Sequence, residues 1–358
     1  MLVVKEVYLC QRINHKKRKM KKNLRNILAL SLALMTTVAF AQDWNVDSRT
    51  RIDMSGDNDK MSTDQRATLG ATWGGSDWGI HISSDVNYTL GGSPNPHMDI
   101  FEAYASTDLM GYASVTAGRQ AINNGSGALM SSNDWAASRT TWDGMTFGLN
   151  LDMADITVGY HSMNAGGIDE ESTGNMWVNA AGEFSGWDVN VLYMTDEASD
   201  NAATGIDISG ELMGAGISAS MNTDFDENTM RVLGVSYAVN DDMSVNVGQT
   251  VYGDETTDGF DMAGTNMSGD AWANGNMGYL NSGDEMLSYG LTYNMAGISM
   301  GATMNAITAL DETLNRDVLE VSLGYSLSDN AALAVKYATD ATGDVESKYT
   351  WLTLTVRP

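Results

Sequence analysis

The feature that most constrains this chain is an alternation of apolar and polar residues along residues 78–90. Successive side chains of a β-strand point to opposite faces, so the alternation predicts a strand with one apolar and one polar face. The segment exceeds the roughly 9 to 11 residues with which a tilted strand crosses a bilayer core. Aromatic residues lie near both ends, as they do at membrane–water interfaces. The apolar parity carries Trp78, Ile80, Ile82, Val86, Tyr88 and Leu90.

The same alternation recurs from residue 42 to the end of the chain, in about eighteen segments. Short turns such as 185–186, 240–242 and 296–297 alternate with longer acidic connections such as 166–174, 196–203 and 254–284. Outer-membrane barrels have short periplasmic turns and long extracellular loops, and a barrel of this size encloses a water-filled lumen. The predicted fold class is therefore all-β, a transmembrane antiparallel β-barrel of about 18 strands with short periplasmic turns and long acidic extracellular loops.

The first 41 residues predict a leader that takes no part in the fold. Lys21, Lys22 and Arg25 precede an apolar stretch at 27–38, and Ala39-Phe40-Ala41 has the small residues of a cleavage site. Residues 20–41 thus predict a signal peptide, with Met20 as a candidate true start and an unusually long charged region as the alternative. The barrel domain is 42–358, and the expected location is the outer membrane of a Gram-negative bacterium, as an integral protein exported by a cleaved signal peptide.

Composition excludes several classes of function. The one cysteine, Cys10, lies in the leader, so the exported chain has no disulfide, thiolate nucleophile or lipid-modified cysteine. Nine of the 20 basic residues and one of the 46 acidic residues also lie there, which leaves a net charge of −34 after residue 41. Nucleic acid is excluded as a partner because phosphate binding needs clustered Lys and Arg. The many Met residues fall mostly on the apolar parity, where they replace Leu.

One region, residues 101–150, resembles a known family. It carries Phe101-Glu102-Ala103-Tyr104, then Ala117-Gly118-Arg119-Gln120, Asn133-Asp134-Trp135, Arg139 and Asp143-Gly144. This pattern resembles the alginate-export family of outer-membrane channels, and the resemblance implies an eighteen-stranded channel. Alginate-exporting members line their pore with many basic residues, whereas this chain has eleven Lys and Arg after the leader. Outside these fifty residues, only the barrel pattern agrees.

Polar and charged residues on the inward parity are the candidates for the channel lumen or its constriction. Arg119 and Asp143 break the alternation, and a β-bulge near the outer rim would turn them inward. There, Arg119 or Arg139 would pair with Asp134 or Asp143 as a clamp, and the loop 122–138 would fold toward the lumen. The alternative is that both residues lie solvated just above the bilayer. The full set of candidates is Arg49, Arg51, Arg66, His81, Asp85, Arg119, Arg139, Asp143, Asp207, Glu211, Glu320 and Lys336.

The arginines of the first two strands have two interpretations. A hairpin centred near Asn58 would place Arg51 opposite Arg66, and like charges across a strand pair are destabilising. Nearby acids, Asp47, Asp53 or Asp64, would neutralise them. Alternatively, the arginines form a basic stripe with Lys336 and Lys348, opposed by lumen acids on other strands, and the resulting transverse field would filter solutes by charge.

No enzyme, cofactor or metal site is expected. His81, Ser83 and Asp85 share one face, but neighbouring members of this series are roughly 7 Å apart on a strand, too far for a catalytic relay. Asp224, Asp226 and Asn228 begin like a calcium loop, yet Thr229 and Val235 stand where such a loop needs Gly and Glu.

The sequence thus predicts a porin or porin-like channel for passive diffusion of small hydrophilic solutes, with a preference for cations or neutral solutes. The alternatives are a substrate-specific oligosaccharide channel of the alginate-export type and a surface-binding structural barrel. The expected partners are the lipid bilayer, lipopolysaccharide, the barrel assembly machinery and small hydrophilic solutes. A homo-oligomer is also compatible with the sequence.

Overall fold

The structure is a computed structural model that describes residues 42–55, 61–92, 96–132, 139–164, 173–253, 260, 280–281 and 283–357. The chain divides into a unit of residues 1–41 and a unit of residues 42–358. The predicted signal peptide lies outside the described residues. Among those residues, no helix is long and apolar enough to cross a membrane.

The second unit is one 18-stranded antiparallel sheet, which confirms the predicted strand number and fold class. Its strands are β1 (Gln42–Asp53), β2 (Ser62–Gly74), β3 (Trp78–Thr89), β4 (His97–Leu109), β5 (Ala113–Gln120), β6 (Trp142–Asn150), β7 (Asp155–Asn164), β8 (Thr173–Phe184), β9 (Trp187–Asp196), β10 (Ala202–Leu212), β11 (Ala215–Thr223), β12 (Thr229–Ala238), β13 (Met243–Tyr252), β14 (Glu285–Met295), β15 (Ile298–Thr308), β16 (Arg316–Ser328), β17 (Ala331–Thr342) and β18 (Val345–Val356).

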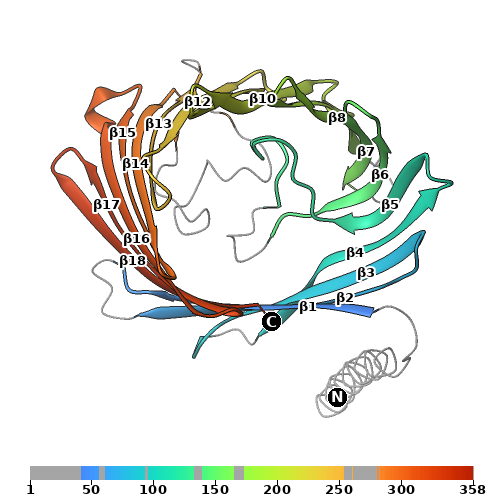
Figure 1. The fold of residues 1–358 in the computed structure, drawn as a ribbon, viewed down its shortest axis with the longest axis horizontal. Coiled ribbons are helices and arrows are strands. Elements are labelled where there is room, and N and C mark those ends of the chain that lie inside the picture. The colour runs from blue at the N-terminus through green and yellow to red at the C-terminus, as the bar shows by residue number, and fades with distance from the viewer. Residues whose placement is uncertain are drawn as a thin grey trace, which may run out of the picture. The chain divides into compact units, whose positions relative to one another are not determined.

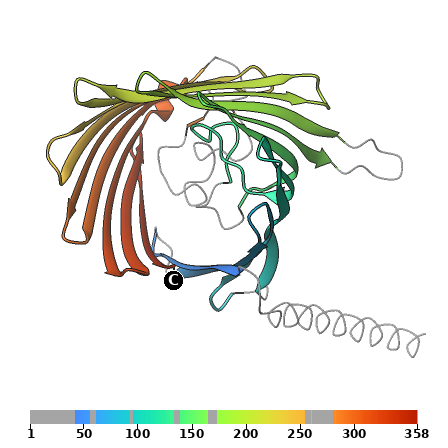
Figure 2. The same cartoon turned by 45° about the vertical axis from the view of Figure 1, so that its right-hand side comes forward.

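The sheet closes into a barrel because the first strand pairs with the last. Each strand pairs with the next along the chain, and β1 pairs with both β2 and β18. The ring is visible in Figure 1, with β1 and β10 on opposite sides, and in Figure 2 after a turn of the view. Closure satisfies the backbone of every strand within the ring, which a hydrocarbon surrounding requires.

The connections define two different rims. One, here called the short-turn rim, has the turns 75–77, 110–112, 151–154, 185–186, 213–214, 239–242, 296–297 and 329–330. The other, the long-loop rim, has the connections 54–61, 90–96, 121–141, 165–172, 197–201, 224–228, 253–284 and 309–315, and one short turn at 343–344.

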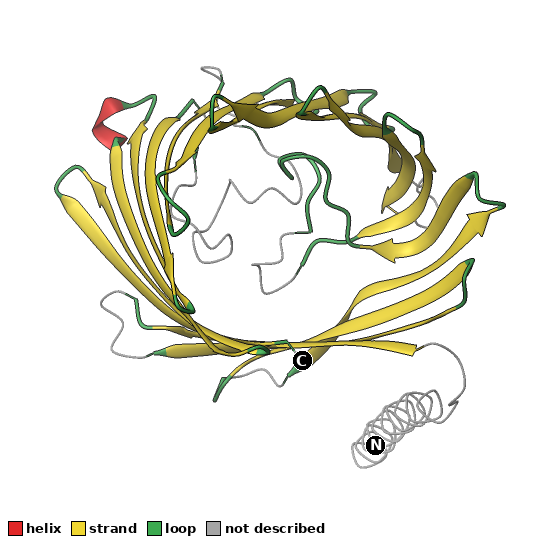
Figure 3. Cartoon of the chain, in the orientation of Figure 1, coloured by secondary structure: helices red, strands yellow, loops and turns green. Residues whose placement is uncertain are grey.

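A single short 3₁₀-helix, η1 (Glu312–Leu314), occurs among the described residues, at the long-loop rim (Figure 3). The Asp311 carboxylate accepts hydrogen bonds from the amide and hydroxyl of Thr313 at its start. These hydrogen bonds stabilise the charged form and hold the pKa of Asp311 below its usual range.

The two faces of the sheet differ as the alternation predicts. On β3, Ile80 and Ile82 are 44% and 41% exposed on the outer face, whereas His81, Ser83 and Asp85 are buried on the inner face. The same outward row of Leu, Ile, Val, Met and Tyr continues on the other long strands. A soluble protein does not leave an apolar surface of this extent in water, so the outer face is suited to lipid.

Candidate functional site

The described part of the loop between β5 and β6, residues 121–132, folds into the barrel toward the far wall (Figure 1). At its tip, the Ser126 amide donates a hydrogen bond of 3.0 Å to Oδ2 of Asp207 on β10. The Ser220 hydroxyl, on β11, donates to the other oxygen of the same carboxylate and lies 3.3 Å from the Ser126 hydroxyl. Gly125 allows this approach: it has φ +55°, and a Cβ there would lie 1.9 Å from Asp207 Oδ2. The loop tip is therefore fixed to the wall opposite β1.

Apolar packing holds the rest of the loop. Ala128, Leu129 and Met130 are buried against inward side chains that include Trp142, Trp177 and Met194. Within the loop, the Asn124 amide donates to the Met130 carbonyl at 3.0 Å. This apolar cluster inside the barrel was not predicted, because the sequence pattern assigns Trp and Met to the lipid-facing side.

The C-terminal end of the same connection is tied to the other side of the lumen. Arg139 donates from Nε and Nη2 to the two oxygens of Asp85 on β3, at 3.0 and 2.6 Å, and Nη2 also lies 3.2 Å from the Thr68 hydroxyl. Its guanidinium carbon is 3.3 Å from the centre of the Phe101 ring. Both charged side chains are buried. We call this group the Arg139 clamp.

A β-bulge in β4 forms part of the Arg139 clamp. The register with β3 passes from Ser83 opposite Glu102 to Ser84 opposite Ile100, so Phe101 has no partner. Phe101 and Glu102 therefore follow each other on the inner face, where Phe101 contacts Arg139 and Glu102 contacts His81. A bulge does turn residues toward the lumen in this region, but in a different strand from the one expected.

Arg119 and Asp143 do not face the lumen. They lie directly opposite each other in an unbroken β5–β6 register, in the same row as Met145 and Phe147 of the outer face. Arg119 donates to both oxygens of Asp143 at 2.7 Å, and both side chains are half-exposed. The predicted inward rotation is wrong because no bulge interrupts these two strands. Of the pairings that the sequence left open, Arg119 with Asp143 occurs, but on the outer face and not as a clamp in the lumen. Asp134 lies outside the described residues.

The arginines of β1 and β2 do share the inner face. Arg51 and Arg66 are buried, and the register places Arg49 opposite Arg66 and Arg51 opposite Asp64. The predicted register was therefore wrong by two residues. The cause is the position of the hairpin: Gly56, Asp57, Asn58 and Asp59 all favour turns, so the sequence alone does not fix its centre.

His81 belongs to a cluster on the inner face. Its Nδ1 lies 2.8 Å from the Thr72 hydroxyl and its Nε2 lies 3.4 Å from Glu102, while its ring stacks on Tyr104 at 5.0 Å. Asp85 is engaged by Arg139 instead. His161, a second histidine of the inner face, is buried edge-on against Trp142.

The last strands carry paired charges. Lys336 forms an ion pair with Glu320 on the inner face. Arg316 makes a two-point contact with Asp340, at 3.1 and 2.9 Å, and both residues are buried. Lys348 pairs with Glu346 at 3.1 Å, but its row is the outer one, so it does not extend a basic stripe in the lumen.

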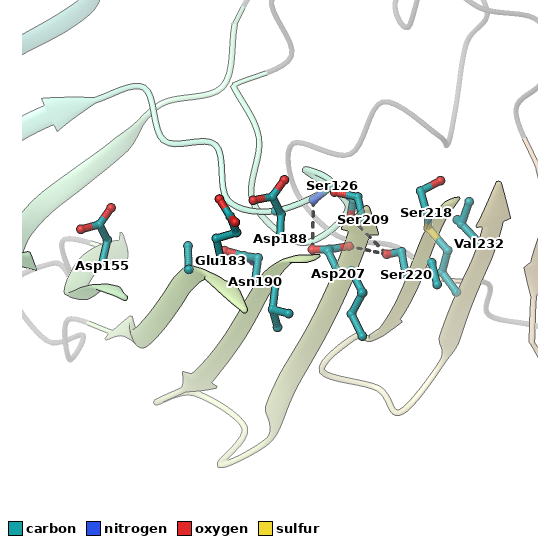
Figure 4. Close-up of a pocket in the computed structure, with 17 residues that line it drawn as sticks. Ser126, Asp155, Glu183, Asp188, Asn190, Asp207, Ser209, Ser218, Ser220 and Val232 are labelled. Atoms are coloured by element: carbon teal, nitrogen blue, oxygen red, sulfur yellow. Dashed lines mark hydrogen bonds between the residues drawn. The ribbon is translucent and has the colours of Figure 1, made fainter. Parts of the chain in front are cut away.

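An acidic cleft lies between the loop tip and the wall formed by β8 to β12. Its volume is about 610 Å³, and the carboxylates that line it are Asp155, Glu183, Asp188 and Asp207 (Figure 4). Glu183 and Asp188 are directly opposite each other across β8 and β9. None of these four carboxylates forms an ion pair with a described residue. Glu211 lies on the same face of β10 and is exposed. This wall is half-way around the ring from the arginines of β1.

The architecture is that of an eighteen-stranded porin-type barrel, and solved structures agree. The chain is similar to Acinetobacter baumannii OccAB2, with a TM-score of 0.70, 12% identity and coverage of 88% of this chain and 98% of that one. Pseudomonas aeruginosa OccD3 (OpdP) gives a TM-score of 0.64, 12% identity and coverage of 90% and 93%. Pseudomonas aeruginosa OpdK with vanillate gives 0.70, 10% identity and coverage of 89% and 100%.

At these identities, the likeness establishes the fold alone. No family model matches the chain. No curated protein matches it by sequence either. The resemblance to the alginate-export family is therefore not confirmed.

Proposed function

We propose that this protein is an outer-membrane channel through which small hydrophilic solutes diffuse passively. The observation that carries the proposal is the loop 121–132, which lies inside a closed barrel and is fixed at its tip by Asp207. A barrel of eighteen strands is too wide for side chains to fill, so an inserted loop narrows a water-filled passage instead of completing a core. Outer-membrane barrels have short periplasmic turns and long extracellular loops, so we assign the short-turn rim to the periplasmic side and the long-loop rim to the extracellular side.

We propose a preference for cationic and neutral solutes. The cleft beside the loop tip carries Asp155, Glu183, Asp188 and Asp207 without a basic partner among the described residues. In contrast, Asp85, Glu320 and Asp340 are each neutralised by a neighbouring cation. In a narrow passage with low-dielectric walls, uncompensated charges of one sign raise the local concentration of counter-ions.

A second candidate is a channel selective for small carboxylates. Arg49, Arg51 and Arg66 cluster on the inner face, and a guanidinium can hold a carboxylate through two parallel hydrogen bonds. OpdK, which shares the fold, has been crystallised with vanillate, an aromatic carboxylate. In this version, the arginines would attract the solute and the acidic wall would orient it.

The decisive experiment is a reversal-potential measurement on the protein in a planar bilayer under a salt gradient. The first candidate predicts a reversal potential displaced toward the cation value. A strong anion preference would reject it in favour of the second. A correctly folded barrel with no measurable conductance would reject both, and would favour a surface-binding structural barrel. Swelling of liposomes in neutral oligosaccharides of increasing size would test the oligosaccharide alternative.

A further inference from the structure

The short-turn rim is not uniform around the barrel. Between β4 and β11, three of its four turns expose large apolar side chains, the exception being Ser185-Gly186: Met110 is 93% exposed, Tyr112 83%, Met153 69% and Met213 97%. Two turns on the opposite side are mainly polar, with Asn240, Asp241 and Asp242 after β12 and Asp329 and Asn330 after β16, although Val239 in the first is 45% exposed. The turn between them, Ala296-Gly297, carries only small residues. We call the first set, with Leu109, Leu151 and Leu212 beside it, the apolar turn arc.

Turn geometry does not account for these residues. Met110 and Met213 have φ +58° and +54°, and each is followed by a glycine that also has positive φ. Such turns favour Asn or Asp at the first position, because other L-residues adopt the left-handed region with difficulty. Methionine is unfavourable in this turn conformation, and the side chains of Met110 and Met213 are almost fully exposed in the barrel. Their presence at these positions therefore indicates a contact with something outside the barrel.

The outer face of the same sector shows what that contact is. On β5 and β6, the Arg119–Asp143 ion pair lies on the outer face near the long-loop rim, and a charged pair of this kind marks the edge of an apolar band. Below it, β5 offers only Ala113, Val115 and Ala117. On β5 the band therefore lacks large side chains before the turn begins, whereas β6 carries Met145, Phe147 and Leu149 on the outer face.

The height of β5 is smaller than the thickness of the apolar band. From Arg119 to Ala113, where β5 begins after the turn, the strand covers six residues, which at about 3.3 Å per residue and a tilt of about 40° is a height of about 15 Å. The apolar band of outer-membrane barrels is about 25 Å tall, so it extends past the turn that carries Met110. On β16, in contrast, the outward row from Leu319 to Leu327 completes the band within the strand, and the turn after it is polar.

We propose that the apolar turn arc is embedded in the acyl-chain boundary of the inner leaflet, while the polar turns of the opposite arc stand in periplasmic water. The occupant of the surface is phospholipid, because the arc is continuous with the lipid-facing row that includes Leu109 and Leu212. Tyr112 has the amphipathic ring expected at such a boundary. The inference rests on the proposed membrane location of the barrel.

Site-directed spin labelling tests the proposal on the full chain. In a Cys10→Ala background, single cysteines replace Met110 or Met213 at the arc, Asp329 as the polar-turn control and Leu323 as the mid-belt control. Each labelled protein is folded into phosphatidylcholine bilayers, and collision rates with oxygen and with a water-soluble nickel chelate are compared. We expect oxygen-to-nickel ratios at positions 110 and 213 several-fold above that at position 329.

The spin-label experiment can overturn the proposal in two ways. The proposal fails if the labels at positions 110 and 213 are as accessible to nickel as the label at position 329. Labels shielded from both reagents also overturn it, because they would show a protein contact. If the Leu323→Cys label does not reach lipid, the barrel is not in the membrane and the proposed function fails as well. If the Leu323→Cys label reaches lipid and only the labels at positions 110 and 213 do not, the arc proposal fails and the channel proposal stands.

Discussion

The most informative perturbation is Arg139→Met, which removes a charge from the lumen and keeps a side chain of similar reach. Arg139 and Asp85 are both buried with the loop in place, so the substitution leaves an uncompensated carboxylate. Loss of one partner from a buried ion pair costs about 3 to 5 kcal/mol. Loss of the cation–π contact with Phe101 adds about 0.5 to 2 kcal/mol.

This cost falls on the state in which the loop is docked, because lifting the connection lets water reach Asp85. A change of 3 kcal/mol lowers the ratio of docked to undocked loop by about a hundredfold. Single-channel recording should therefore show frequent transitions to a larger conductance in Arg139→Met. Adding Asp85→Asn removes the uncompensated charge. The double variant should therefore show fewer transitions to the larger conductance than Arg139→Met alone.

Arg119→Met is the matched control, since it breaks an equally well-formed Arg–Asp contact on the outer face. That pair is half-exposed, and Arg119 also donates to the Ile100 carbonyl of β4 at 3.2 Å, so its hydrogen bonds go to strands and not to the described part of the loop. Its loss should cost about 1 kcal/mol or less and leave the conductance unchanged. The reasoning is refuted if Arg139→Met conducts like the parent protein, or if Arg119→Met alters the open-channel current as much.

Three further predictions follow from the same geometry. Gly125→Ala places a methyl group against the Asp207 carboxylate, so the loop tip should shift and the single-channel conductance rise; an unchanged current would contradict the assigned contact. Asp188→Lys replaces a negative charge of the acidic cleft with a positive one and should move the reversal potential toward the anion value. An unchanged reversal potential, or a shift in the other direction, would show that the cleft does not face the ion path. Gly118 has φ +128°, and a Cβ there would lie 2.2 Å from the Ala103 carbonyl oxygen, so Gly118→Ala should lower the urea midpoint of unfolding by disrupting β4–β5 pairing; equal midpoints would exclude that strain.

Much of the fold was predictable because one rule repeats. The alternation of apolar and polar residues indicates which face of each strand contacts lipid and which contacts water. It located nearly every strand, and it placed the end of β3 to within one residue. Hairpin register was harder. The register between β1 and β2 depends on where a polar loop turns, and Arg51 was placed opposite the wrong residue for that reason.

The constriction was only partly predictable. Gly125 and Gly127, which have positive φ, were visible as Gly residues in the sequence, but the hydrogen bond from Ser126 between them to Asp207 joins segments about eighty residues apart. The apolar cluster that packs against the loop was not predicted, because Met130 and Met194 are residues of the type that the sequence pattern assigns to the lipid-facing row. Arg139 and Arg119 have the same chemistry in sequence, and only the bulge at Phe101 and the unbroken β5–β6 register separate their roles.

The central claim is that a closed, lipid-embedded barrel encloses a water-filled passage narrowed by the loop that Asp207 and Arg139 hold. Planar-bilayer recording of the folded protein tests it most directly, with neutral polymers of graded size added to the bath. We predict steady ohmic conductance that small polymers reduce and larger polymers leave unchanged, with the cut-off moving to larger polymers in Arg139→Met. A folded protein that passes no current, or whose polymer cut-off is the same with and without the Arg139 clamp, would contradict the account.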